Sequence, residues 1–246
     1  MPTVRIIGPG RAGGALALAL AGAGWDVDEP VRRGDDLTHV AIGPDLLVIA
    51  TPDGAIAEVA AAIQPTPGAL VAHMAGSLGL DVLGSHAHRA CIHPLVPIPD
   101  AHTGARRMRG AWFGVAASTD SARRQVDRTI ADLGARAVTI DDEDRAAYHA
   151  AAAIASNHLV ALLGQVERVA ATAGVPLEAY LDLVRATVDN VALLGPVAAL
   201  TGPIARGDEA TVERHRAALP ADELAAYDAL ADQARRLVAG RGTGAR

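Results

Sequence analysis

Short apolar runs alternate with helical patterns over the first 142 residues of the chain. Buried parallel strands are nearly continuous apolar runs, whereas helices repeat their apolar positions every three or four residues. On this basis we expect strands at 4–7, 24–27, 46–50, 69–74, 86–93, 111–116 and 135–140, with helices at 14–23, 55–63 and 121–133. The alternation predicts an α/β Rossmann-type, doubly wound parallel sheet.

Only helical patterns follow residue 142, at 145–173, 177–194, 209–219 and 222–239, so the second half is predicted to be all-α. The acidic run 141–144 is typical of a helix N-terminus, and we place the domain boundary there, between 1–142 and 143–246. The helix from 145 is apolar nearly all round as far as Leu163, which predicts that it is buried. The tail 240–246 is expected to be unstructured.

The first expected strand ends in a turn with Gly-x-Gly-x-x-Gly spacing. In a dinucleotide site the first glycine allows the turn, the second lets backbone approach a pyrophosphate, and the third lets the following helix pack on the strand. The pyrophosphate would rest on unpaired N–H groups at the positive end of that helix. We therefore predict a dinucleotide-binding turn made of Gly8, Pro9, Gly10, Arg11, Ala12 and Gly13.

Arg32 and Arg33 follow the second expected strand, where an acidic residue would bind the ribose 2′-hydroxyl of NAD and an arginine would accommodate the 2′-phosphate of NADP. They favour NADP(H) over NAD(H). The alternative is that they are solvated loop residues and that Asp28 or Glu29 binds the ribose instead.

Ligands of open α/β sheets bind beyond the carboxyl ends of the strands. The third and fourth expected strands end at such positions, which makes Thr51, Pro52, Asp53 and Ser77 candidates for the cofactor site. His93 ends the fifth strand and is a candidate for the wall of the active cleft.

Composition excludes several kinds of chemistry. All 22 basic residues are arginine, so no lysine can form a Schiff base or act as a general acid. The net charge of −6 and the lack of a basic stripe argue against nucleic-acid binding. No apolar run is long enough to span a bilayer, and the apolar start of the chain is too interrupted by glycine for a signal peptide. With Cys91 as the single cysteine, we expect a cytoplasmic protein without a membrane partner.

His86, His88, Cys91 and His93 are candidates for a metal site, because imidazole and thiolate bind zinc. Their spacing matches no zinc motif, so no metal is expected. Cys91 is better explained as a small core residue.

Polar residues on the first helix of the second half point to a substrate site. His149, Ser156 and Asn157 lie at i, i+7 and i+8, one stripe of an α-helix, with small alanines between them. The alternative is that neighbouring backbone satisfies these side chains. Further on, glycines and a proline fix the segment 200–208 as a constrained loop carrying Thr201 and Arg206, and Arg206 is suited to bind a carboxylate.

These motifs occur in an order that resembles a known family. The segments 7–13, 49–53, 93–95, 148–152 with 156–157, and 200–208 are similar to those of a two-domain family with a Rossmann-like first half and a helical second half of unknown function. That family is related to ketopantoate reductases, pyrroline-carboxylate reductases and β-hydroxyacid dehydrogenases. The helical half also resembles the C-terminal domain of 6-phosphogluconate dehydrogenase, and the resemblance implies a homodimer.

In ketopantoate reductases the helical domain opens with a catalytic lysine, followed by asparagines four and eight residues later. By this resemblance His149 takes the place of the lysine, Ala153 that of the first asparagine and Asn157 that of the second, while Arg32 matches the 2′-phosphate arginine. The missing lysine and asparagine put the substrate in doubt more than the cofactor.

The resulting prediction is an NADPH-dependent reductase of a small 2-oxo or 3-oxo carboxylic acid, with 2-dehydropantoate as the best single substrate. His149 would donate a proton, Asn157 would orient the oxygen, and His93 is the reserve donor. Arg206, with Ser156 and Thr201, would bind the substrate. The alternatives are a cofactor-binding sensor or scaffold without turnover, and an imine reductase of the pyrroline-carboxylate kind.

Overall fold

The computed structural model describes residues 1–240, so the expected unstructured tail lies, from residue 241 on, outside the described residues. The chain divides into two compact units that meet at Ser156 and Asn157. We expected a boundary at 142/143 from the acidic run. That boundary stays a prediction, and the two units are described below one at a time.

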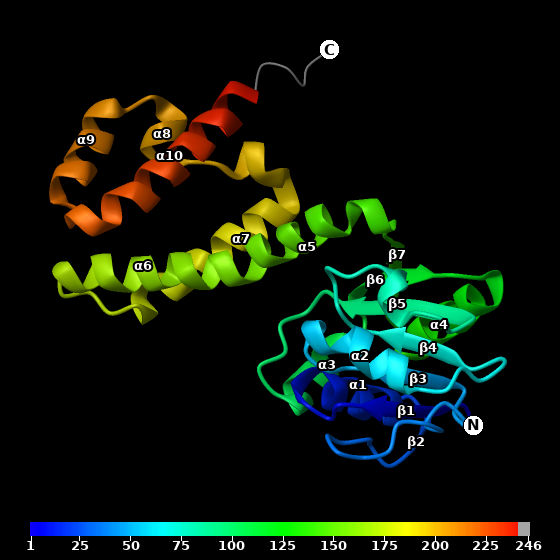
Figure 1. Cartoon of the computed structure of the whole chain (residues 1–246). Coiled ribbons are helices and arrows are strands. Elements are labelled where there is room, and N and C mark those ends of the chain that lie inside the picture. Colours follow the sequence, from blue (N-terminus) through cyan, green and yellow to red (C-terminus); the bar gives the residue numbers. More distant parts are fainter. Residues whose placement is uncertain (241–246) are drawn as a thin grey trace. The chain divides into compact units, whose positions relative to one another are not determined.

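The first unit is built around a seven-stranded sheet (Figure 1). Its strands are β1 (Thr3–Ile7), β2 (Asp26–Val27), β3 (Leu46–Ile49), β4 (Leu70–His73), β5 (His88–Pro94), β6 (Trp112–Ala117) and β7 (Arg136–Thr139). All seven expected strands are present. The inner strands β3 and β4 are apolar runs buried on both faces, whereas the edge strands β2 and β7 are mostly exposed.

The strand order is β2-β1-β3-β4-β5-β6-β7. The first five strands are parallel, β6 is antiparallel to β5, and β7 is parallel to β6. The Rossmann-like fold class is thus confirmed, with one antiparallel pair that the apolar pattern did not reveal. After β2 the chain crosses β1 to form β3 on its other side, so the strand order reverses between β1 and β3. This is the topological switch point at which open α/β sheets bind ligands.

Helices cover both faces of the sheet (Figure 1). The helices α1 (Arg11–Ala21), α3 (Ala101–Met108) and α4 (Asp120–Asp132) contribute buried residues to one apolar core, while α2 (Ile56–Ala62) contributes to the other. The pattern did not predict α3, whose His, Thr and Gly are weak helix formers. Its start is fixed by Asp100, whose side chain accepts a hydrogen bond of 2.8 Å from the backbone N–H of Thr103.

The long helix expected from residue 145 is interrupted. It consists of α5 (Arg145–Ala153), a π-helical turn at Ile154–His158, and α6 (Leu159–Thr172). The wider π turn alters the helical register on which the stripe of His149, Ser156 and Asn157 was based. The expected burial is also wrong: α5 buries only Arg145 and α6 only Ala170. Alanine makes these helices apolar without requiring a cover.

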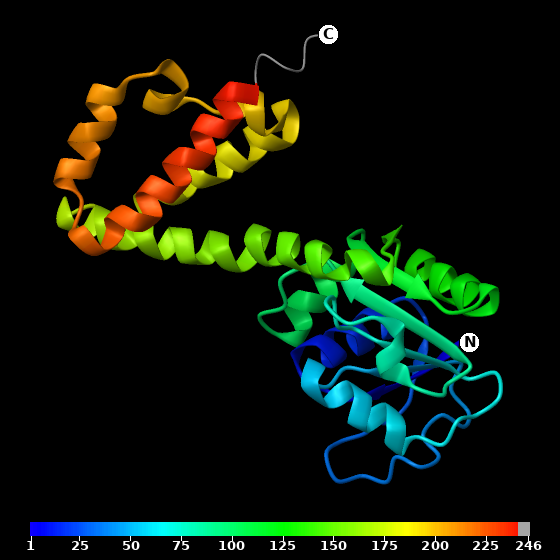
Figure 2. The same ribbon diagram turned by 45° about the horizontal axis from the view of Figure 1, so that its top comes forward.

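The second unit is helical, as expected. After α6 it contains α7 (Glu178–Ala199), α8 (Gly202–Arg206), α9 (Glu209–Ala218) and α10 (Leu224–Ala239). The α8 helix packs against α9 and α10, and α10 also lies against α7 (Figure 2). The expected loop 200–208 instead contains α8. Gly207 ends that helix in the left-handed conformation at φ +69°.

Two helical stretches, Asp142–Thr172 and Glu178–Arg206, are long and apolar enough to cross a bilayer, contrary to our expectation that no such run exists. An apolar helix covered by protein passes the same test. In the second stretch Asp182, Arg185 and Asp189 place three charges within two helical turns, which is costly in a lipid-facing helix. Large apolar side chains are nevertheless exposed on α7, among them Leu183 and Leu193.

Candidate functional site

A cleft of about 690 Å³ opens at the switch point between β1 and β3. This volume is in the range typical of sites for cofactors and small molecules. Among the residues that line it are seven of those selected from the sequence: Gly8, Pro9, Gly10, Arg32, Arg33, Thr51 and Pro52. Three separate chain segments thus converge where the fold alone predicts a ligand.

The three motif glycines are placed differently. Gly8 makes its turn at φ +89°, and a Cβ there would lie 3.1 Å from the Ala50 carbonyl carbon. A Cβ on Gly13 would lie 2.9 Å from the Ala50 Cβ, because α1 packs closely on the sheet at this position. A Cβ on Gly10 would meet no protein atom within 4 Å. Gly10 therefore faces open space at the N-terminus of α1, where a pyrophosphate would need room.

Two other motif residues do not line the cleft. Arg11 begins α1 and is exposed, whereas Ala12 packs against the apolar core.

Arg32 and Arg33 are exposed on the wall of the cleft, and neither guanidinium forms an ion pair within residues 1–240. The alternative ribose ligand Asp28 is engaged elsewhere, in an ion pair of 2.6 Å with Arg5. Glu29 is exposed and does not line the cleft. The cleft therefore presents two arginines after β2 whose guanidinium groups form no ion pair within residues 1–240, together with Asp35, whose carboxylate accepts a hydrogen bond of 2.6 Å from the backbone N–H of Arg32.

The turn after β3 adds two further features. The hydroxyl oxygen of Thr51 is buried and has no hydrogen-bond partner within the described chain. Such a hydroxyl is available to form a hydrogen bond with a ligand. Asp53 does not line the cleft, but its carboxylate accepts a hydrogen bond of 3.2 Å from Ser77, in the loop after β4. This bond links the turn after β3, at the cleft, to the loop after β4.

Next to Ser77, three aromatic side chains meet beyond the end of β4. The His93 Nδ1 atom on β5 lies 2.7 Å from the hydroxyl oxygen of Tyr148 on α5. The His149 ring meets the His93 ring edge-on, with 6.0 Å between the ring centroids. His93 and His149, both selected from the sequence, thus lie next to each other, and Tyr148 joins them.

Two glycines make room for this cluster. A Cβ on Gly76 would lie 2.8 Å from the His93 Cε1 and 2.9 Å from the His149 Cδ2. A Cβ on Gly114, in β6, would collide with the Tyr148 hydroxyl. Any side chain at either position would push the three rings apart.

Burial keeps the hydrogen-bonded pair uncharged. It lowers the pKa of His93 to about 4, with a further contribution from the nearby His149, and it raises the pKa of Tyr148 to about 12. At neutral pH a neutral imidazole therefore faces a neutral phenol.

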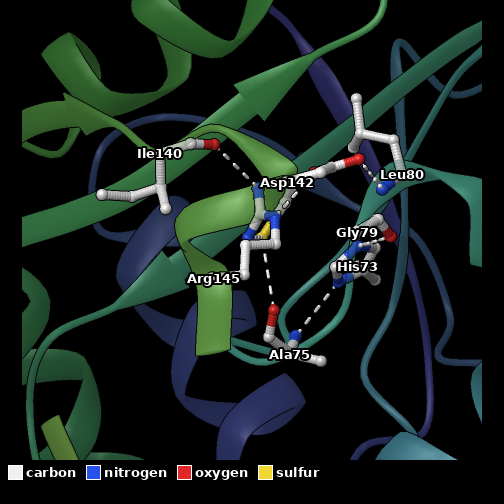
Figure 3. A network of polar contacts seen from close by, with 8 residues as sticks. His73, Ala75, Gly79, Leu80, Ile140, Asp142 and Arg145 are labelled. Carbon is white, nitrogen blue, oxygen red and sulfur yellow. Dashed lines mark hydrogen bonds and ion pairs between the residues drawn. The ribbon is translucent and has the colours of Figure 1, made fainter. Parts of the chain in front are cut away.

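Arg145 anchors the helix that carries Tyr148 and His149 (Figure 3). It is 1% exposed, and it donates hydrogen bonds to Asp142 Oδ1 at 2.9 Å and to Cys91 Sγ at 3.2 Å. Burial raises the pKa of Cys91 to about 11, so the thiol stays protonated and donates to the carbonyl of Ala75 at 3.3 Å. The guanidinium thus ties the start of α5 to the middle of β5.

The same network holds the loop after β4 (Figure 3). The backbone N–H of Leu80 donates to Asp142 Oδ2 at 3.2 Å, and His73 Nε2 lies 3.2 Å from the Gly79 carbonyl oxygen. The backbone N–H of Ala75 donates to His73 Nδ1, also at 3.2 Å. Gly76 and Ser77 therefore lie on a loop that is fixed on both sides.

The considered metal residues do not form a ligand set: no group of three or more His, Cys, Asp or Glu side chains that could hold a metal occurs within residues 1–240. His86 instead binds the carbonyl of Ala60, and His88 binds the Thr119 hydroxyl.

The substrate-binding candidates of the helical half lie on separate elements. Ser156, in the π turn, donates to the carbonyl of Ala152 at 2.8 Å, and Asn157 follows it as the first residue of the second unit. Thr201 precedes α8 and Arg206 ends it, and both are exposed. Their role in binding substrate stays a prediction.

Sequence reasoning missed Tyr148, Arg145 and Gly76. Tyr148 precedes the selected His149, and only its distance to His93 distinguishes it. The acidic run before Arg145 was interpreted as a helix start, although an arginine three residues after an aspartate is also a signal for an anchoring pair. Gly76 lies outside every motif selected from the sequence.

A family model described as a domain of unknown function, DUF2520, matches residues 111–234, which are 124 of the 246 residues. No curated protein matches the chain.

Solved structures share the fold along the whole chain. A candidate NADP oxidoreductase from Bacteroides fragilis is 23% identical, with a TM-score of 0.79, covering 96% of this chain and 98% of that one. A Thermotoga maritima protein is 22% identical, with a TM-score of 0.75 and coverages of 97% and 99%. Plasmodium falciparum pyrroline carboxylate reductase with NADP bound is 14% identical, with a TM-score of 0.64 and coverages of 96% and 98%.

Proposed function

The chain belongs to the family described as the domain of unknown function DUF2520, and because that description includes no reaction, we propose that this member is an NADPH-dependent oxidoreductase. The observation that carries the proposal is the cleft at the switch point. It combines the open space at Gly10 with Arg32 and Arg33, whose guanidinium groups form no ion pair within residues 1–240. The fold shared with the NADP-bound reductase from Plasmodium falciparum supports the same cofactor.

The residues present fit this cofactor. Gly10 and the N-terminus of α1 would hold the pyrophosphate, and Arg32 and Arg33 would hold the 2′-phosphate. The orphaned Thr51 hydroxyl would gain a partner. NADPH supplies a hydride when bound. A carbonyl that accepts a hydride also needs a proton, and the cluster of His93, Tyr148 and His149 lies on the neighbouring strand ends, joined to the cleft by Asp53 and Ser77.

For the substrate we propose a small 2-oxo or 3-oxo carboxylic acid, with 2-dehydropantoate as the first compound to test. The proposal rests on the resemblance to ketopantoate reductases and on Arg206 as a carboxylate ligand. His149 is the proton donor that the sequence favours. Imine reduction is the second candidate, because the fold is also that of pyrroline carboxylate reductase and of the reductive aminase from Aspergillus terreus. A cofactor-binding sensor would share the cleft but would not need the polar cluster.

The first experiment measures coenzyme binding by tryptophan fluorescence. Wild type should bind NADPH more tightly than NADH. Arg32→Ala should weaken NADPH binding about tenfold or more, because it removes a charge-assisted hydrogen bond, and should leave NADH binding unchanged. Arg128→Ala, an exposed arginine on α4, is the control. Equal affinities for both coenzymes in wild type would contradict the choice of NADP.

A second variant tests the glycine turn. Gly10→Ala should weaken binding of both coenzymes, since its methyl group would occupy the space that the pyrophosphate needs, with little effect on folding. Gly164→Ala in α6 is the matched control, because its Cβ would make only an ordinary contact at 3.6 Å with Arg168. If neither coenzyme binds wild type, the proposed function is wrong. A screen of NADPH oxidation with 2-oxo acids, 3-oxo acids and cyclic imines then identifies the reaction.

We also propose that the protein is a cytoplasmic homodimer. The exposed apolar side chains of α7, among them Leu183, Leu193 and Leu194, support a protein cover for this helix. The buried free Cys91 is consistent with a reducing compartment.

A further inference from the structure

We propose that the Tyr148 hydroxyl is the proton donor of the reductase, with His93 as the residue that holds it in position. This assignment rests on the proposed function and moves the donor role from His149 to the residue before it. The 2.7 Å contact between His93 and Tyr148, set in a space that two glycines leave open, carries the proposal.

The Tyr148 hydroxyl is held in one position by its neighbours. A general acid must be held within hydrogen-bonding reach of its target, in a fixed orientation. The Tyr148 hydroxyl lies 2.7 Å from His93 Nδ1 and packs against Gly114, where a Cβ would collide with it. Within residues 1–240 the His149 ring has no hydrogen-bond partner and makes only the edge contact with His93. The tyrosine is therefore the oriented group and the histidine is not.

When a phenol gives up its proton, the remaining tyrosinate needs a hydrogen-bond donor in place beforehand. The neutral His93 ring supplies one when Nδ1, 2.7 Å from the hydroxyl oxygen, carries its proton. Because burial holds the pKa of His93 at about 4, this ring stays neutral at physiological pH and does not compete to donate the proton itself.

NADPH would supply the hydride, losing a C–H bond and becoming NADP⁺, while the substrate carbon would gain a C–H bond and the electron pair of the C=O π bond would move to oxygen. That oxygen would take the proton of Tyr148, which leaves a tyrosinate hydrogen-bonded to His93 Nδ1. Water then returns a proton to the tyrosinate. For an imine substrate the nitrogen takes the place of the oxygen.

The helical unit contains a matched control. The Tyr227 hydroxyl lies 2.9 Å from His215 Nδ1, so the chain holds a second histidine–tyrosine pair of the same kind. Tyr148→Phe and Tyr227→Phe each remove one hydroxyl from such a pair. Tyr148→Phe should lower kcat by about 10²–10⁴ with the KM and NADPH affinity unchanged, whereas Tyr227→Phe should have wild-type kinetics.

The second measurement needs no turnover. Nitrogen-15 NMR of the coenzyme-free protein at neutral pH should find His93 neutral with its proton on Nδ1, and the His93→Gln variant identifies the resonance. Tyr148→Phe should shift that resonance, and Tyr227→Phe should leave it in place. An unshifted His93 resonance in Tyr148→Phe would show that the two side chains are not hydrogen-bonded, which would overturn the proposal.

The two proposals fail in distinguishable ways. If a substrate is found but Tyr148→Phe turns over at the wild-type rate, or if His149→Ala loses more rate than Tyr148→Phe, the donor assignment is overturned and the proposed function stands. If NMR finds the pair but no carbonyl or imine is reduced, both the function and the donor role are overturned. A lower kcat in Tyr148→Phe together with a shifted His93 resonance supports both the proposed function and the donor role of Tyr148.

Discussion

The α/β unit and the helical unit differ in how much of their apolar surface the chain itself covers. The α/β unit holds two apolar cores, one on each face of its sheet. Within the described part of the helical unit, the buried apolar residues are Ala170, Val212 and Ala231, all small or medium in size. On α7 alone Leu183, Val188, Val191, Leu193 and Leu194 are exposed. The first unit is stabilised by its own core, whereas the second has apolar helices that need a cover.

Matched leucine truncations should show this difference most strongly. Leu16→Ala, in α1 of the α/β unit, removes a side chain that is 0% exposed and should lower the free energy of unfolding by about 2–5 kcal/mol. Leu183→Ala in α7 removes a side chain that is 64% exposed and should cost far less. Urea unfolding of both variants provides the measurement. If Leu183→Ala lowers the free energy of unfolding only at high protein concentration, a second copy of the chain covers α7. If Leu183→Ala and Leu16→Ala lower it equally at all concentrations, the comparison of the two units is contradicted.

Two arginine–aspartate pairs with the same i, i+3 spacing should also differ. Arg145 pairs with Asp142 at 2.9 Å and is 1% exposed, whereas Arg185 pairs with Asp182 at 2.6 Å and is 69% exposed. Arg145→Ala should destabilise the α/β unit by about 2–3 kcal/mol, because buried hydrogen bonds to a charged group are lost. Arg185→Ala should produce no resolvable change, since exposed pairs are screened by water. Both tryptophans, Trp25 and Trp112, lie in the α/β unit, so their fluorescence reports the first effect directly.

The cover of α7 can be tested by adding a charge. Leu193 is 80% exposed, and Leu193→Asp should raise the dissociation constant of the proposed homodimer at least tenfold, or about 1.4 kcal/mol, because a carboxylate would be buried between copies. Leu18→Asp places the same charge on α1, where the leucine is 40% exposed, and should leave the dimer intact. Light scattering across a dilution series measures both. A monomeric wild type would show that another partner, or none, covers this helix.

The same contrast explains what the sequence could predict. In the α/β unit every expected strand formed, because runs such as Leu46–Ile49 are apolar for one reason only, burial on both faces. In the helical unit the all-round apolar pattern from Arg145 to Leu163 was interpreted as burial, although alanine supplies much of it. A periodic pattern of apolar residues identifies the helix face that will be buried, but it does not show which element or protein packs against that face.

The site divides in the same way. Gly8, Gly10 and Arg32 could be found because a local turn and its next strand determine their positions. The pairing of His93 with Tyr148 joins residues 55 apart in the chain and depends on room left by Gly76 and Gly114, which only the packed structure reveals. The π turn at Ile154–His158 likewise has no sequence pattern that we could recognise.

The smallest expected effect is a pH dependence located in the α/β unit. Burial lowers the pKa of His73 and of His93 from 6.5 to about 4, with contributions from the charges of Arg145 and His149 respectively. Below pH 6.5 the unfolded chain binds protons at both residues while the folded chain does not, so stability is complete above pH 6.5 and falls as the pH drops toward 4. Between pH 6.5 and 5.5 the loss should be about 1 kcal/mol for each histidine.

Urea unfolding followed by tryptophan fluorescence at pH 6.5 and 5.5 isolates this contribution, since carboxyl groups keep their charge over that range. His73→Gln keeps a hydrogen-bonding side chain that does not titrate. Between pH 6.5 and 5.5 its free energy of unfolding should therefore fall by about 1 kcal/mol less than that of wild type. His102→Gln, an exposed histidine on α3, should lose as much as wild type. If His73→Gln loses as much unfolding free energy as wild type, His73 accepts a proton in the folded protein. Water would then reach the end of β4 more readily than the burial of His73 indicates.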